Sequence, residues 1–88
     1  MKLKITYTKR FSKHYLNLNN KEKELFKEKL DTFIKNPRHP SLRTKKIQGS
    51  DGLWEFSVNM DIRVIWFKEN NELVILVDIG HHDILNKF

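Results

Sequence analysis

The apolar residues of this sequence change their spacing near Pro37, and that change restricts the fold more than any other feature. Before Pro37, after a short alternating start, apolar residues recur every three or four positions, as on one face of a helix. After Gly52 they alternate with polar residues or run continuously, as in strands. Helices followed by a run of strands, in a chain of 88 residues, predict an α+β fold around one hydrophobic core.

The N-terminal third predicts one strand and two helices. Residues 2–7 alternate apolar and polar side chains, as a half-buried strand does. Thr8 can cap a helix that runs to about Asn17. The apolar positions expected on this helix are Phe11, Tyr15 and Leu18.

The second helix is predicted from Asn20, as its N-cap, to about Asn36. It must end there because Pro37 disfavours helical geometry in the residue before it. One stripe of this helix should face the core, formed by Leu25, Phe26, Leu30, Phe33 and Ile34.

The C-terminal half predicts strands joined by tight turns. After a loop that can hold a short strand at Arg43–Ile47, three strands are expected at Leu53–Val58, Ile62–Lys68 and Leu73–Ile79. The last is almost continuously apolar, which is typical of a central strand with a neighbour on each side. The order β-α-α-β-β-β predicts a twisted, mainly antiparallel sheet with a helical hairpin packed on one face. We expect residues 1–88 to form a single domain.

Charge and composition narrow the classes of function. Residues 1–49 carry 14 Lys and Arg against 4 Asp and Glu, whereas residues 50–88 carry 3 against 7. This asymmetry indicates a basic face turned toward a polyanion, although a lysine-rich solvated surface gives the same pattern. The chain has no cysteine, which excludes disulfides, thiol catalysis and cysteine-based zinc sites. Because the sequence lacks the apolar stretch of a signal peptide or a membrane span, we expect a soluble cytoplasmic protein with no membrane partner.

Six short segments, in this order, carry a resemblance to a known family: Thr8–Phe11, Asn36–Pro37, Lys45–Gly49, Gly52–Trp54, Ile62–Trp66 and Asp78–Asn86. On these segments the chain resembles the RelE/ParE toxin superfamily over almost its whole length. Two positions depart from the family pattern. Ile62 replaces a usual tyrosine, and Asn86 replaces a closing aromatic residue that the family uses in catalysis or in stacking on the substrate base.

The resemblance implies the toxin of a type II toxin–antitoxin system, with a cognate antitoxin protein as its partner. It further implies a ribosome-dependent endoribonuclease that cleaves mRNA through attack of the substrate's own 2′-hydroxyl, without a metal or cofactor. Two alternatives remain open at this point: a ParE-like inhibitor of DNA gyrase, and a degenerate nucleic-acid-binding member of the fold without nuclease activity.

Such cleavage requires a base, an acid and cations around the phosphorane. Arg63 is the candidate for the phosphate, and its alternative is a structural ion pair with Glu55 or Asp78. His82 is the candidate proton carrier, unless it is merely exposed or caps a turn. Asp83 either orients a histidine or caps the C-terminal turn.

His81 is a weaker candidate than its neighbour His82, since adjacent residues of an extended chain point to opposite faces. The same divergence disfavours a metal site at His81–Asp83. Glu55 can be a general base, a partner of Arg63, or a sign of another activity, and Asn86 is a further possible site residue.

A basic segment before the strands is the candidate for binding the RNA backbone, although a solvated run of charge is the alternative: Arg38, Arg43, Lys45 and Lys46. His39 is a lesser candidate base. Trp54 and Trp66 can stack on bases, but their place in strands favours core packing.

Overall fold

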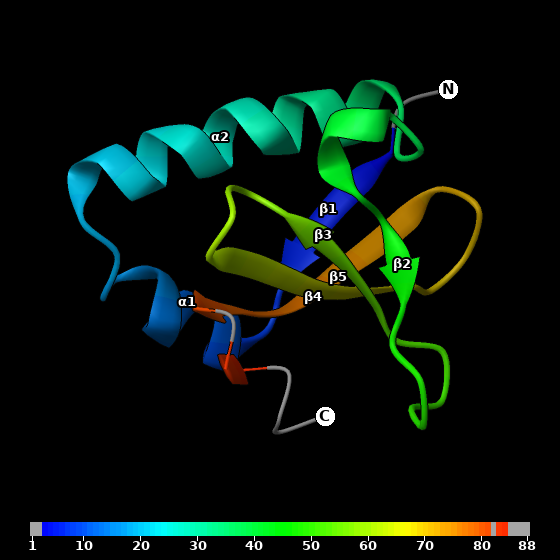
Figure 1. The fold of residues 1–88 in the computed structure, drawn as a ribbon. Helices are drawn as coiled ribbons and strands as arrows, with labels where there is room; N and C mark the ends of the chain where they lie inside the picture. The colour runs from blue at the N-terminus through cyan, green and yellow to red at the C-terminus, as the bar shows by residue number, and fades with distance from the viewer. Residues whose placement is uncertain (1–2, 82, 85–88) are drawn as a thin grey trace.

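The computed structural model describes residues 3–81 together with residues 83 and 84 (Figure 1). The elements along the chain are β1 (Lys4–Tyr7), α1 (Lys9–Tyr15), α2 (Asn20–Lys35), the 3₁₀ turn η1 (Pro40–Leu42), β2 (Lys45–Lys46), β3 (Trp54–Ser57), β4 (Ile62–Lys68) and β5 (Leu73–His81).

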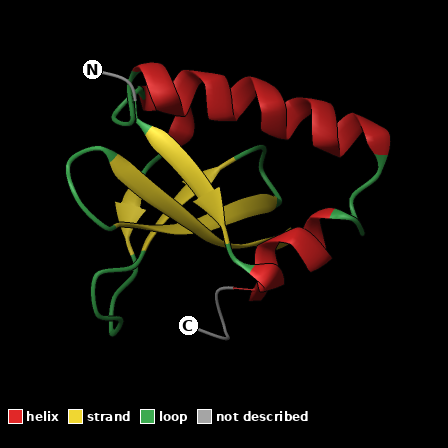
Figure 2. Cartoon of the chain, turned by 180° about the vertical axis from the view of Figure 1, so that it is seen from behind, coloured by secondary structure: helices red, strands yellow, loops and turns green. Residues whose placement is uncertain are grey.

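The five strands form one sheet in the order β1-β5-β4-β3-β2. The β1–β5 pair is parallel and the other pairs are antiparallel, which confirms the predicted mainly antiparallel sheet. β5 has a neighbour on each side, as its apolar sequence indicated. α2 lies across one face of the sheet, and α1 continues from β1 beside the second half of β5 (Figures 1 and 2).

Thr8 attaches α1 to the sheet. Its side chain caps the helix by accepting a hydrogen bond from the N–H of Phe11 at 3.0 Å, as predicted. Its backbone N–H donates to the carbonyl of Leu76, and its hydroxyl donates to the carbonyl of Val77 at 2.5 Å. α1 therefore takes the position beside β5 that β1 leaves, although it ends at Tyr15 rather than near Asn17.

The N-cap of α2 is Asn19 rather than the predicted Asn20. The Asn19 side chain accepts a hydrogen bond from the N–H of Glu22 at 2.8 Å, and the Glu22 carboxylate accepts one from the N–H of Asn19 at 2.9 Å. This reciprocal capping box satisfies two backbone donors that a helix start otherwise leaves unpaired. Glu22 therefore determines which of the two asparagines begins the helix.

The main core lies between α2 and the sheet. Phe26 and Phe33 of α2 are buried there, and the Phe33 ring packs 4.9 Å from both Phe56 and Trp66, measured between ring centroids. Phe11 is also buried, so the predicted aromatic core is confirmed. The rest of the predicted α2 stripe is only partly buried, and Ile34 lies outside the core cluster.

Among the described residues, the sheet face opposite α2 carries a small apolar cluster of Ile47, Ile65 and Ile84, with Leu53 and Val77 at its margin. We call this the open face. Figure 1 shows residues 83–84 on this side of the sheet, beyond the end of β5. In the part of the chain that the structure describes, no helix is long and apolar enough to cross a membrane.

Candidate functional site

The open face holds two rows of side chains, because directly opposed residues of antiparallel strands point to the same face. One row crosses the sheet through Lys45, Glu55, Ile65 and Asp78. The other crosses it through Ser57, Arg63 and Gly80. The two rows bring four charged residues from four strands to one side of the sheet, although Asp78 is completely buried there.

Arg63 is fixed in place on this face, near the start of the central strand β4. Its Nη1 donates to the backbone carbonyls of Asn59 at 2.7 Å and Ile62 at 3.2 Å, and its Nε lies 3.7 Å from a carboxylate oxygen of Glu55. Only 14% of the Arg63 side chain is exposed. The Glu55 ion pair considered from sequence is therefore present, and the guanidinium is held ready but partly neutralised.

Glu55 is 5% exposed and lies between two basic residues. Arg63 is its ion-pair partner, and Lys45 stands directly opposite it on β2. A carboxylate placed between two cations can accept a proton from a substrate hydroxyl that those cations hold near it. The same contacts also fit a purely structural ion pair.

The pairing of Asp78 with α1 is the feature that sequence reasoning missed. Its carboxylate is completely buried and meets two side chains of α1, with Nδ1 of His14 at 2.5 Å and Nε of Arg10 at 3.3 Å. It also accepts a hydrogen bond from the N–H of Ile79 at 2.8 Å. Asp78 thus pairs with α1 and not with Arg63, the partner considered from sequence. Two features of the sequence indicate this pairing: an acidic residue within an apolar strand, and two basic residues, Arg10 and His14, spaced four apart on one helix.

His81 lies on the other side of the sheet from Arg63. It stands opposite Ile62, whose side chain belongs to the main core, and its Nδ1 contacts the Asp61 carboxylate. That hydrogen bond with Asp61 is the chief cause that raises the pKa of His81 above 6.5. Burial opposes the shift, while the negative charges of Asp61, Glu22 and Asp83 add to it. His81 therefore faces away from Arg63, and its lesser part in catalysis stays a prediction.

Of the three C-terminal candidates His82, Asp83 and Asn86, the structure describes Asp83. His82 and Asn86 lie outside the described residues. Asp83 is exposed, and its charge acts on His81. Among the residues described, no group of three or more His, Asp and Glu side chains is placed to hold a metal ion.

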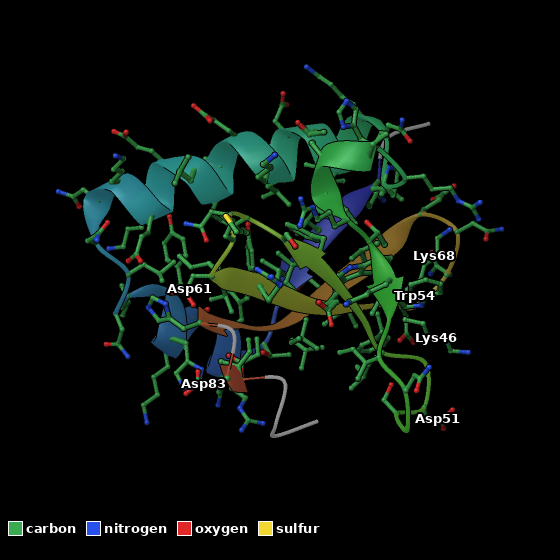
Figure 3. All side chains as sticks on the ribbon, viewed as in Figure 1. Lys46, Asp51, Trp54, Asp61, Lys68 and Asp83 are labelled. Atoms are coloured by element: carbon green, nitrogen blue, oxygen red, sulfur yellow. The ribbon has the colours of Figure 1, made fainter. Side chains whose placement is uncertain are left out.

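The predicted RNA-binding residues do not form one surface. Lys45 belongs to the open face, whereas Lys46, the next residue of β2, stands opposite Trp54 on the α2 side. Arg38 and Arg43 lie in the loop after α2, on that same side. In Figure 3, Lys46, Trp54 and Lys68 lie at one end of the sheet, and Asp61 and Asp83 lie near the other.

The chain combines two helices with a five-stranded sheet, and its sequence identifies the family to which it belongs. Its sequence matches the family described as the ParE toxin of the type II toxin–antitoxin system parDE, over residues 5–85. The chain therefore belongs to this family and is a toxin of a type II toxin–antitoxin system. No curated protein matches its sequence.

Solved structures of related toxins share the fold. A chain of the archaeal RelE–RelB complex from Pyrococcus horikoshii is similar with a TM-score of 0.74 and 18% identity, over 92% of this chain and 96% of that one. A chain of the Escherichia coli DinJ–YafQ toxin–antitoxin complex is similar with a TM-score of 0.75 and 22% identity, over 97% of this chain and 98% of that one. The YoeB/ParE toxin from Agrobacterium tumefaciens is similar with a TM-score of 0.76 and 12% identity, over 91% of this chain and 99% of that one. At these identities the likeness establishes the fold.

Proposed function

We propose that this toxin is a ribosome-dependent endoribonuclease that cleaves mRNA on the open face of its sheet. The observation that supports this function best is the placement of Arg63. Its guanidinium is positioned by two backbone carbonyls, beside the Glu55 carboxylate and in the row next to Lys45. A guanidinium fixed in advance can stabilise a phosphorane without reorganising during the reaction.

Each group required for cleavage has a candidate. Arg63 and Lys45 neutralise the phosphorane oxygens. Glu55 takes the proton of the substrate 2′-hydroxyl, which then attacks the adjacent phosphorus. His82, proposed from sequence, protonates the departing 5′-oxygen. The toxin binds its RNA substrate at this site only when the ribosome presents it. Because mRNA and ribosomes are cytoplasmic, a protein with this activity acts in the cytoplasm.

Two observations favour a second candidate function, inhibition of DNA gyrase by a toxin without nuclease chemistry. The family match is to a ParE toxin. In addition, Glu55 partly neutralises the cation that phosphate would need, since their charged atoms are 3.7 Å apart. The two functions differ in the process that fails first in the cell, and this difference can be measured.

We also propose a cognate antitoxin as the physiological partner. Matched structures include complexes of RelE with RelB and of YafQ with DinJ. An acidic segment of an antitoxin would complement the excess of Lys and Arg in residues 1–49 and would block access of RNA to that surface. Co-purification from the native operon tests this, and a partner that binds only the acidic C-terminal half would contradict it.

The experiment that separates the two functions is induction of the toxin, followed in parallel by primer extension on mRNA and by plasmid supercoiling. We expect cut messages and halted translation while supercoiling remains normal. Arg63→Ala should remove the cuts while the protein stays folded, and Lys21→Ala, which deletes an exposed helix charge, should cut like wild type. Supercoiling that fails first, with messages intact, would replace the nuclease by the gyrase inhibitor.

A further inference from the structure

A pocket of about 700 Å³ opens on the α2 side of the sheet, at the opposite end from His81. It lies between the C-terminal end of α2, the loop that follows it, and the strand ends that carry Trp54 and Lys68. Figure 3 shows these two residues on the same side of the molecule. This volume falls within the range of about 300–1,000 Å³ that small-molecule sites occupy.

The lining of this pocket is basic. Arg38, His39, Arg43 and Lys68 contribute to it, and among the described residues no Asp or Glu does. Within the described part of the chain, no carboxylate forms an ion pair with Arg38, Arg43 or Lys68. Three uncompensated positive charges around one concave surface favour an anionic ligand.

The floor of the pocket is aromatic. Trp54 and Trp66 stack with ring centroids 5.8 Å apart and an angle of 21° between their planes. Trp66 is 6% exposed, and its indole Nε1 is buried without an acceptor among the described residues. A buried donor left unpaired is costly, and a ligand acceptor that reached this indole would relieve the cost. Trp54 is only partly buried and gives the pocket an accessible ring.

The loop that carries the cations is built in advance. The Thr44 hydroxyl donates to the carbonyl of Pro37 at 2.9 Å and closes the loop, while buried Leu42 anchors it. Arg43 adopts a left-handed backbone with φ of 49°, which is uncommon outside glycine, and its N–H donates to the carbonyl of Pro40. A ligand would therefore meet this loop without having to order it.

The histidine of this loop is oriented as a donor. Nδ1 of His39 accepts a hydrogen bond from the N–H of Ser41 at 3.1 Å. The neutral ring that makes this bond carries its proton on Nε2, so the free nitrogen is a hydrogen-bond donor. An acceptor-rich ligand such as a phosphate matches this donor as well as the three cations.

We propose that this pocket binds a nucleoside phosphate, with the base against Trp54 and the phosphate held by Arg38, Arg43 and Lys68. Every base has a flat face that stacks on an aromatic ring. A guanidinium group can bind a phosphate through two parallel N–H···O hydrogen bonds. The pocket and Arg63 lie on opposite sides of the sheet, so this binding does not rest on the proposed cleavage. The nucleotide comes either from solution or from a single-stranded RNA.

The two tryptophans of the sequence both line this pocket, so intrinsic fluorescence reports directly on its occupancy. The purified toxin is titrated with GMP, AMP, ribose 5-phosphate, a single-stranded RNA octamer and a glutamate-rich peptide. We expect saturable quenching by the mononucleotides. Ribose 5-phosphate, which lacks a base, should bind about 5- to 150-fold more weakly, the usual worth of one base–aromatic stack.

Variants distinguish the pocket from the open face. Trp54→Ala should weaken GMP binding by the same roughly 5- to 150-fold, and Trp54→Phe, which keeps a ring, should restore most of it. Arg38→Ala and Lys68→Gln should each weaken binding and reduce its dependence on salt. Lys45→Ala and Arg63→Ala, on the open face, should leave binding unchanged, whatever they do to cleavage. If Trp54→Ala does not fold, Trp54→Phe and Lys68→Gln carry the test.

Two results would overturn the proposal: equal binding of ribose 5-phosphate and GMP, or binding of the acidic peptide alone. The octamer identifies the source of the nucleotide. An affinity at least tenfold above that of GMP at low salt assigns the pocket to an RNA strand, and equal affinity assigns it to a free nucleotide.

Discussion

Substituting Gly80 by alanine tests how the C-terminal turn is held on the open face. Gly80 stands opposite Arg63, and Ile84 packs directly over it. A Cβ at position 80 would overlap Cγ2 of Ile84 and lie 3.6 Å from its Cδ1. Because Cγ2 is a branched methyl on a restricted side chain, the turn must move rather than rotate one bond.

The size of the effect follows from the burial of Ile84, which is 7% exposed. Burying such a side chain contributes about 1.5–3 kcal/mol, and lifting the turn away forfeits no more than this. Gly80→Ala should therefore lower the free energy of unfolding by about 1–3 kcal/mol in a urea titration. It should also reduce cleavage, because Ile84 directly follows the candidate site residues His82 and Asp83 in the sequence.

A double-mutant cycle makes this prediction strict. In an Ile84→Ala background the overlapping methyl is gone, so Gly80→Ala should cost almost nothing, and the coupling energy should equal the loss of about 1–3 kcal/mol that Gly80→Ala causes in the wild type. Asp31→Ala, which removes the carboxylate that pairs with Lys35 on the exposed side of α2, should be additive with Gly80→Ala. Additive effects of Gly80→Ala and Ile84→Ala would refute the reasoning.

Three further predictions concern stability and titration. Asp78→Ala should lower the free energy of unfolding by about 2–4 kcal/mol, because its two basic partners on α1 lose their buried carboxylate. Asp31→Ala, which breaks an exposed pair with Lys35, should lower it by less than about 0.5 kcal/mol. Equal losses in the two variants would contradict this prediction. His81 should titrate above 6.5 by NMR, and Asp61→Asn should bring its pKa back down. Because the folded pKa is the raised one, this contribution to stability is complete below about pH 6.5 and is lost as pH rises through the raised value. Asn19→Ala should lower stability by about 1 kcal/mol, and an unchanged urea midpoint would contradict its role as the N-cap.

Local patterns in the sequence predicted most of the fold. The strand at Ile62–Lys68 has the predicted bounds, because turn residues lie at both of its ends. The start of α2 was wrong by one residue, although the spacing of Asn19 and Glu22 contains the capping box that decides it. The short strand predicted at Arg43–Ile47 is only the two residues Lys45–Lys46 long. It starts late because Arg43 adopts a left-handed backbone that ends the 3₁₀ turn.

The candidate site was harder to predict because it depends on pairings between distant residues. His14 and Asp78 are 64 residues apart, and no local pattern joins them. Lys45 and Lys46 looked like one basic patch, but as neighbours in a strand they point to opposite faces. The pairing of Arg63 with Glu55 was an alternative visible in the sequence, yet only the register of β3 and β4 places the two side chains together.

Single-turnover cleavage of mRNA on a programmed ribosomal complex, with purified toxin in excess, tests the proposed nuclease most directly. We expect the wild-type protein to cut, and Arg63→Ala to slow cutting by roughly 10²–10³, the usual loss when one transition-state donor is removed. His82→Gln should slow it by about 10²–10⁴, while His81→Gln, on the other side of the sheet from Arg63, should be close to wild type. Wild-type toxin that leaves the message intact, or Arg63→Ala that cuts at the wild-type rate, would contradict nuclease action at the open face.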